Sequence, residues 1–179
     1  MTERMILVAV DLQKDFIDGA LGTREAEAIV PAAAERIREK REAGAELFAT
    51  LDTHEADYAQ TQEGKRLPVP HCIRGTEGWQ LNPLIREALG ENCTLVEKPT
   101  FGSVRLPELI RERIGDGKGA VIELLGLCTD ICVVSNALLL KAAFPEAVIQ
   151  VNGGCCAGVT PEKHRATLET MASCQIDIL

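Results

Sequence analysis

Two cysteines lie four positions apart in the stretch VIELLGLCTDICVV, residues 121–134. The pattern predicts a buried strand, a tight turn and a helix with Thr129 or Asp130 as its N-cap. Cys132 would then lie in the first helical turn, where the free N–H groups and the helix dipole lower the pKa of a thiol. Cys132 is therefore a candidate nucleophile, and the N–H groups of Cys128 and Cys132 are candidates for an oxyanion hole. The alternative is that both cysteines only fill space in the core.

A nucleophilic thiol needs a base and a group that balances charge, and two residues are placed for these roles. Asp11 follows the apolar run MILVAV, and Lys98 follows the run CTLVE. Asp11 is suited to accept the thiol proton and return it to a leaving amine, while Lys98 would balance the carboxylate charge. Taken singly, Asp11 is better interpreted as a loop-capping acid and Lys98 as a solvated lysine.

A second group of polar residues lies in one long polar stretch. Asp52 and His54 are two positions apart, so their side chains point the same way in an extended segment. His71 comes from the far end of the stretch, and Glu63 lies between. Oxygen and nitrogen ligands in this number suit Zn²⁺, and also Mn²⁺ or Fe²⁺. The alternative is a surface acid–histidine pair with an unrelated His71 and a solvated Glu63. The third histidine, His164, is interpreted as an ordinary surface residue.

The fold must bring these residues together, and the order of the expected elements indicates how. Apolar runs predict strands at 5–10, 45–50, 93–97, 119–125, 146–151 and 175–178. Helical patterns separate them near 25–43, 82–89, 106–114, 130–143 and 161–173. This alternation predicts right-handed βαβ units and an α/β fold of three layers, α/β/α, with a six-stranded, mostly parallel sheet. The ligand site of such a sheet lies at the carboxyl ends of its strands, where the candidate residues fall. Residues 52–80 show little periodicity, which is typical of a functional loop.

Composition bounds the class of protein. The 179 residues are expected to form one domain, and the net charge of −8 argues against binding to nucleic acid or to an anionic membrane. No apolar run resembles a signal peptide or a membrane span, so we expect a soluble, cytoplasmic protein. Seven cysteines in such a chain do not predict a disulfide framework.

Three motifs together resemble the Asp–Lys–Cys triad of the isochorismatase-like cysteine hydrolases. They are DLQKDF with Asp11, KPTFGS with Lys98 and GLCTDICV with Cys132. The resemblance runs along almost the whole chain, and the pattern DTH…H makes it most similar to the nicotinamidase branch. It implies a Rossmann-like, isochorismatase-like fold, a single cysteine-hydrolase domain over residues 1–179 and a homo-oligomer. It also implies a cis peptide bond between Leu127 and Cys128.

The resemblance further implies the reaction. The Cys132 thiolate would attack an amide carbonyl, Asp11 would pass the proton to departing ammonia, and water would hydrolyse the thioester. The small-molecule amide expected from the nicotinamidase branch is nicotinamide, which would give nicotinate and ammonia. Two alternatives remain. One is a family hydrolase of another substrate, such as a carbamoyl or ureido amide or isochorismate, although isochorismatase-type members need no metal and the DTH…H pattern counts against that version. The other is a non-catalytic domain, against which the joint presence of Asp11, Lys98 and Cys132 counts.

The site residues implied by the resemblance form two further sets. Nicotinamidases bind a divalent metal ion, most often Zn²⁺, through an Asp, two His and a fourth residue that varies, for which we choose Glu63. The expected metal ligands are Asp52, His54, Glu63 and His71. In that branch the metal holds the pyridine nitrogen, and Phe16 matches an aromatic residue that lies against the ring. Phe101 and Leu127 complete the expected substrate-binding residues.

Overall fold

A computed structural model describes residues 4–179. Within this range six strands form one sheet, in the order β3-β2-β1-β4-β5-β6, and every neighbouring pair is parallel. The strands are β1 (Arg4–Val10), β2 (Glu46–Asp52), β3 (Thr94–Lys98), β4 (Ala120–Leu127), β5 (Val148–Ala157) and β6 (Asp177–Ile178). The predicted α/β/α fold is confirmed, and the sheet is wholly rather than mostly parallel.

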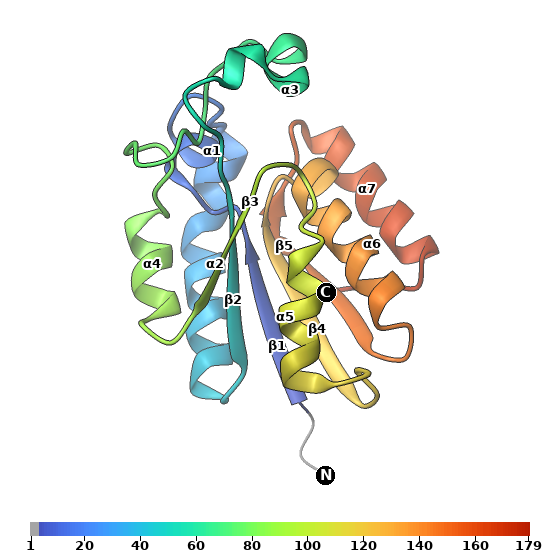
Figure 1. Cartoon of the computed structure of the whole chain (residues 1–179). Helices are drawn as coiled ribbons and strands as arrows, with labels where there is room; N and C mark the ends of the chain where they lie inside the picture. The colour runs from blue at the N-terminus through green and yellow to red at the C-terminus, as the bar shows by residue number, and fades with distance from the viewer. Residues whose placement is uncertain (1–3) are drawn as a thin grey trace.

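Helices cover both faces of the sheet (Figure 1). One face carries α2 (Arg24–Glu42) and α4 (Pro83–Leu89), and the other carries α5 (Arg105–Ile114), α6 (Val134–Ala143) and α7 (Pro161–Ser173). Right-handed crossovers explain this division, because the chain moves outward from β1 to β3 and then in the opposite direction from β4 to β6. The order reverses between β1 and β4, so a ligand site is expected beyond the carboxyl ends of these two strands. Among the helices of the described residues, none has the length and apolar character needed to span a membrane.

Three short elements were not predicted: α1 (Lys14–Ile17), the 3₁₀ turn η1 (Tyr58–Gln60) and α3 (Gln62–Arg66). Elements of three to five residues are too short to show a helical hydrophobic period, which explains why the sequence pattern misses them. The π-helical turn η2 (Thr129–Val133) lies at the start of the helix predicted near 130–143. The helix α3 begins where the Thr61 side chain accepts a hydrogen bond from the Gly64 N–H at 3.0 Å. Glu63 is therefore carried by a helix that lies beyond the carboxyl ends of the strands (Figure 1).

The strand β5 is longer than predicted because it continues through Asn152 and two glycines. A register shift between Leu124 and Gly126 allows it to stay paired with β4. Gly126 has a φ of +126°, and a Cβ atom there would lie 2.1 Å from the Val10 carbonyl oxygen. Only glycine therefore fits this close approach of β1 and β4, which lies at the end of the sheet where the site forms.

One carboxylate interrupts the apolar centre of the sheet. Glu123 on β4 is fully buried, and its two oxygens accept hydrogen bonds from Arg36 at 2.8 and 2.9 Å. Lys40 lies 3.0 Å away on the same helix, α2. Burial opposes ionisation of Glu123, but the bonds and charges of Arg36 and Lys40 outweigh it, so the pKa of Glu123 is lowered. This cluster attaches α2 to the sheet.

Replacing Glu123 with glutamine is expected to lower the free energy of unfolding near neutral pH by about 2–3 kcal/mol. This loss is at the low end of the destabilisation usually caused by removing one partner of a buried ion pair. The reason is that Arg36 is partly exposed and water can solvate it once Glu123 is replaced. Since the folded pKa of Glu123 is depressed, its contribution is present above the unfolded pKa, near 4.5, and fades as the pH falls below it. Urea unfolding at a series of pH values measures both effects.

The exposed neighbour Glu39, which also contacts Arg36, offers a matched control. Glu39→Gln is expected to change stability by less than about 0.5 kcal/mol. If Glu123→Gln is no less stable than Glu39→Gln, the buried cluster does not hold α2 in place.

Candidate active site

Three buried polar residues meet beyond the carboxyl ends of β1, β3 and β4. Asp11 directly follows β1, Lys98 is the last residue of β3, and Cys132 lies in η2 after β4. Lys98 Nζ is 2.6 Å from Asp11 Oδ2 and 3.6 Å from Cys132 Sγ. At most 4% of each residue is exposed. The structure thus brings together the acid, the amine and the thiol that the sequence singled out.

The local backbone aims the Asp11 carboxylate. Asp11 has a φ of +48°, in the left-handed region that residues other than glycine seldom adopt. Its N–H donates to the Thr50 carbonyl at 3.1 Å, and the Thr50 hydroxyl donates to Asp11 Oδ1 at 2.6 Å. Asp11 Oδ2 lies 2.6 Å from Lys98 Nζ in a buried ion pair. One oxygen is therefore held by Thr50, and the other faces Lys98 on the side of Cys132.

Electrostatics at the thiol differ from the sequence-based expectation. Burial raises the pKa of Cys132 well above its usual value, and the charge of Asp11 adds to the rise while Lys98 opposes it. The prediction of a lowered pKa was wrong, because loss of hydration outweighs the field of one helical turn. The N-cap of η2 is Cys128 and not Thr129 or Asp130.

The neighbouring groups have raised pKa values as well. Burial raises the pKa of Asp11, which brings this carboxyl closer to neutral pH than an exposed acid. Burial opposes the charge of Lys98, but Asp11 and Cys132 outweigh it and raise the pKa of the amine, which stays protonated. The resting group is consequently a neutral thiol beside an ion pair, and it reacts only if a base takes its proton.

The turn that carries Cys132 has a distinctive backbone. The Leu127–Cys128 peptide bond is cis, as the family resemblance implied. The Cys128 carbonyl accepts a hydrogen bond from the Val133 N–H at 3.1 Å, while the Cys128 N–H donates to no residue in the part of the chain that the structure describes. That N–H is available to a ligand beside Cys132, as an oxyanion hole would require.

Two side chains that the sequence did not indicate hold this turn in place. Asn136 is fully buried and donates to the carbonyl oxygens of Cys132, at 2.8 Å, and Phe101, at 3.2 Å. Thr129 is paired with His164 through a 2.7 Å contact between its hydroxyl and Nδ1. His164 is therefore half-buried and supports the turn that carries Cys132. It is not the ordinary surface residue that was expected. For Asn136 the only signal in the sequence was its position four residues after Cys132, on the same side of the expected helix.

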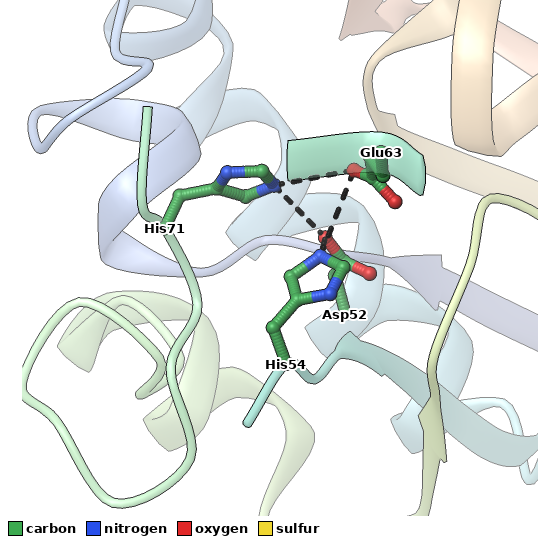
Figure 2. A group of neighbouring side chains, drawn as sticks. All are labelled: Asp52, His54, Glu63 and His71. Carbon is green, nitrogen blue, oxygen red and sulfur yellow. Dashed lines mark hydrogen bonds and ion pairs between the residues drawn. The ribbon is translucent and has the colours of Figure 1, made fainter. Parts of the chain in front are cut away.

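A second cluster lies beside the first (Figure 2). Four side chains point toward one another, and each offers one ligand atom within 4.8 Å of the others. They are Asp52, His54, Glu63 and His71, the set expected from the sequence. Nε2 of His54 is 3.0 Å and Nε2 of His71 is 3.4 Å from Asp52 Oδ2, and both are 3.7 Å from Glu63 Oε1. Asp52 ends β2, Glu63 lies on α3, and His71 comes from the loop that follows α3.

The donor chemistry of this cluster fits a divalent metal ion. Imidazole nitrogens and carboxylate oxygens are ligands that Zn²⁺ binds in proteins. His71 Nδ1 lies 2.8 Å from the Val69 carbonyl, to which it can donate, so Nε2 is the nitrogen that the neutral ring would offer to a metal. Burial raises the pKa of Glu63, whereas hydrogen bonds from His54 and His71 lower that of Asp52 against the effect of burial. The residues present therefore fit the group that the family resemblance implied.

Aromatic side chains enclose the two imidazoles. The Tyr58 ring lies edge-on to both, with centroid distances of 4.8 Å to His54 and 5.1 Å to His71. The Phe16 ring lies 5.5 Å from that of His71. Of the other expected substrate-binding residues, Leu127 is fully buried at the end of β4, and Phe101 is 44% exposed on the loop after β3. The roles of Phe16, Phe101 and Leu127 in substrate binding remain predictions.

Comparison with known proteins gives a consistent result. The family model for the isochorismatase domain matches residues 5–179. The isochorismatase-family protein PncA of Bacillus subtilis, described as uncharacterized, is 32% identical over 148 residues, which are 74% of this chain and 75% of the relative. The structure of the nicotinamidase/pyrazinamidase PncA from Bacillus subtilis superposes with a TM-score of 0.86 and 27% identity over 98% of each chain. That of the pyrazinamidase of Pyrococcus horikoshii in complex with zinc gives 0.84 and 26%, again over 98% of each chain.

Proposed function

The chain belongs to the isochorismatase family, and from this premise we propose that it is a metal-containing cysteine amidohydrolase that converts nicotinamide and water to nicotinate and ammonia. Its similarity to nicotinamidases and pyrazinamidases supports a hydrolase that acts on amides. The observation that carries the finer proposal is the contact between the two clusters. Lys98 Nζ, which pairs with Asp11, is also 3.8 Å from Asp52 Oδ1. The two clusters are therefore adjacent, as a substrate that contacts both the metal ligands and the thiol would require.

The first step uses the thiol and the acid. As the Cys132 sulfur forms a bond to the carbonyl carbon, its proton passes to Asp11 Oδ2. The developing negative charge on the carbonyl oxygen is stabilised by the N–H groups of Cys128 and Cys132. Lys98 keeps its charge throughout and holds the carboxylate in place. The raised pKa of Asp11 suits this exchange, since a general base works best when its pKa approaches the working pH.

The second step releases ammonia and regenerates the enzyme. Asp11 gives its proton to the amide nitrogen, the carbon–nitrogen bond breaks, and ammonia leaves a thioester on Cys132. Water then attacks the thioester carbon while Asp11 accepts one of its protons. The carbon–sulfur bond breaks, the proton returns from Asp11 to the sulfur, and the acid leaves and gives its own proton to solvent or ammonia, which yields nicotinate. One carboxyl group therefore serves as both base and acid.

The second cluster positions the substrate in this proposal. Asp52, His54, Glu63 and His71 would hold a divalent ion, with Zn²⁺ the best match to the donors. When bound, the ion would supply a Lewis-acid ligand position for the ring nitrogen of the substrate. Phe16 would pack on the ring, with Phe101 and Leu127 at its other contacts. The proposal places the whole reaction in one cytoplasmic cysteine-hydrolase domain, residues 1–179, that assembles as a homo-oligomer.

Ammonia release across a panel of amides tests this function. We expect the highest kcat/KM for nicotinamide, followed by pyrazinamide, and much lower values for carbamoyl and ureido compounds. Removal of metal by a chelator is expected to lower kcat/KM for nicotinamide by at least about 100-fold, because substrate orientation and polarisation are lost. Addition of Zn²⁺ to the stripped protein should restore it.

Two results would contradict the proposal in different parts. A preference for a carbamoyl or ureido compound, or hydrolysis of isochorismate, would make the chain a family hydrolase of another substrate. Full activity on nicotinamide after verified removal of all metal would keep the substrate and exclude the role of the second cluster.

A further inference from the structure

The segment that joins β1 to α1 contacts the metal-ligand cluster through a buried glutamine. Gln13 is fully buried, and its Oε1 accepts a hydrogen bond from the Asp52 N–H at 2.8 Å. Its Nε2 donates to the carbonyl oxygens of Asp52 and Trp79, both at 2.8 Å. The amide thus binds the Asp52 backbone on both of its polar groups, much as a neighbouring strand would. This fixes the backbone of one ligand at the point where β2 ends.

The first turn of α1, which directly follows Gln13, reaches the histidines through a second side chain. Asp15 Oδ2 accepts a hydrogen bond from the Cys72 N–H at 2.8 Å. Cys72 directly follows His71 and has a φ of +47°, so its backbone needs such support. The Cys72 carbonyl in turn accepts from the His54 N–H at 3.0 Å. Asp15 therefore acts on the backbone next to His71 and, through Cys72, on His54.

The packing around Asp15 leaves its carboxylate little freedom. A Cβ atom on Gly78 would lie 2.1 Å from Asp15 Oδ2, so only glycine permits this approach. The Gly78 carbonyl also accepts a hydrogen bond from the Asp15 N–H at 3.0 Å. The loop before α4 and the carboxylate are thus fitted to each other, and the direction of the Asp15 side chain is set by tertiary packing.

We propose that Gln13 and Asp15 are positioning residues for the metal ligands, and that residues 11–15 thereby join the proton-transfer group and the metal cluster in one short segment. The inference rests on the proposed function, because it assigns a role at the same site. Neither residue is a metal ligand or a catalytic residue. Partners of metal ligands usually affect affinity by 10- to 100-fold, since the ligands must be held in a fixed geometry.

Zinc binding by the full chain tests this proposal without any activity measurement. A competing chromogenic chelator gives the Zn²⁺ affinity of the parent and of Gln13→Leu, Asp15→Ala and Asp15→Asn. We expect Gln13→Leu and Asp15→Ala to bind Zn²⁺ about 10- to 100-fold more weakly. Asp15→Asn keeps an oxygen that can accept from the Cys72 N–H, so its affinity should stay within about threefold of the parent.

A core variant separates positioning from general loss of stability. Ile110 is fully buried on α5, on the opposite face of the sheet from α2. Ile110→Ala should lower the urea midpoint yet leave the Zn²⁺ affinity unchanged. The proposal is overturned if Gln13→Leu and Asp15→Ala bind Zn²⁺ like the parent, or if Ile110→Ala loses as much affinity as they do.

The remaining outcomes are also informative. If Gln13→Leu does not fold, the comparison of Asp15→Ala with Asp15→Asn decides alone, since equal affinities of that pair contradict the role of the Cys72 bond. If the parent binds no Zn²⁺, the metal part of the proposed function fails, and this inference falls with it. Binding by the parent with unaffected variants overturns the positioning role alone.

Discussion

Cys132→Ala is expected to lower the rate of amide hydrolysis by at least about 10⁴-fold, because in the proposed mechanism the sulfur bonds to the substrate carbon. The substitution removes a single heavy atom from a side chain that packs in the core, so the protein should remain folded. Ammonia release from nicotinamide measures the loss. Mass spectrometry of the quenched parent reaction should show the acyl group on the peptide that contains Cys132.

Cys128 provides the matched control four residues away. It is expected to act through its backbone N–H, so Cys128→Ala should keep the rate within about threefold of the parent. Burial raises the pKa of the Cys128 thiol to about 12 and also raises that of Cys132, so the two thiols are distinguished by geometry, since Lys98 Nζ lies 3.6 Å from Cys132 Sγ. Activity that survives in Cys132→Ala and disappears in Cys128→Ala would reverse the assignment of the two cysteines.

Asp11→Asn should lower kcat by about 10³-fold or more, while the Cys132 thiol becomes easier to ionise. The amide can turn its oxygen toward Lys98 and donate from its nitrogen to the Thr50 hydroxyl, so the side chain should remain in place. An amide cannot take the thiol proton or deliver it to the leaving nitrogen, and loss of that proton transfer is worth about 10²–10⁴ in rate. The substitution also removes a negative charge that raises the pKa of Cys132 and leaves the positive charge of Lys98, which lowers it.

The rate of alkylation of Cys132 as a function of pH distinguishes these two effects. In Asp11→Asn the alkylation profile should move to lower pH, although turnover falls. An exposed acid, Asp57, supplies a control, since Asp57→Asn should change neither property. A profile that moves to higher pH, or turnover above about a tenth of the parent value, would mean that Asp11 is not the proton-transfer group.

Much of the fold could be predicted because its signals are local. The strands β1 and β4 are buried on both faces and appear as continuous apolar runs, so the sequence pattern predicts them directly. The end of β5 could not be predicted, since Asn152 and two glycines indicate a turn, and only the register shift beside Gly126 lets the strand continue. Helices of one turn, such as α3, have no period that a pattern could detect.

The candidate site shows the same division. Asp11, Lys98 and Cys132 were found because parallel strands end at a common edge, which places residues that follow different strands together. Gln13 and Thr50 were missed because each acts on a segment 39 positions away in the sequence, and no local pattern contains that pairing. The direction of the Cys132 pKa was wrong because hydration depends on everything packed around the thiol, whereas the sequence shows only the helix to which it belongs.

Of the four candidate ligand positions, position 63 on the short helix α3 is the one where a substitution should disturb the fold least. Asp52 ends a strand and the histidines are anchored to the main body of the protein, but Glu63 is carried by a small closed unit. The Tyr58 hydroxyl donates to the Leu67 carbonyl at 2.9 Å, and Gly64 fits where a Cβ atom would lie 2.0 Å from the Tyr58 carbonyl oxygen. A substitution at position 63 should therefore leave the sheet undisturbed. If the cluster binds a metal ion as proposed, position 63 is therefore the natural place to alter the choice of metal in a redesigned protein.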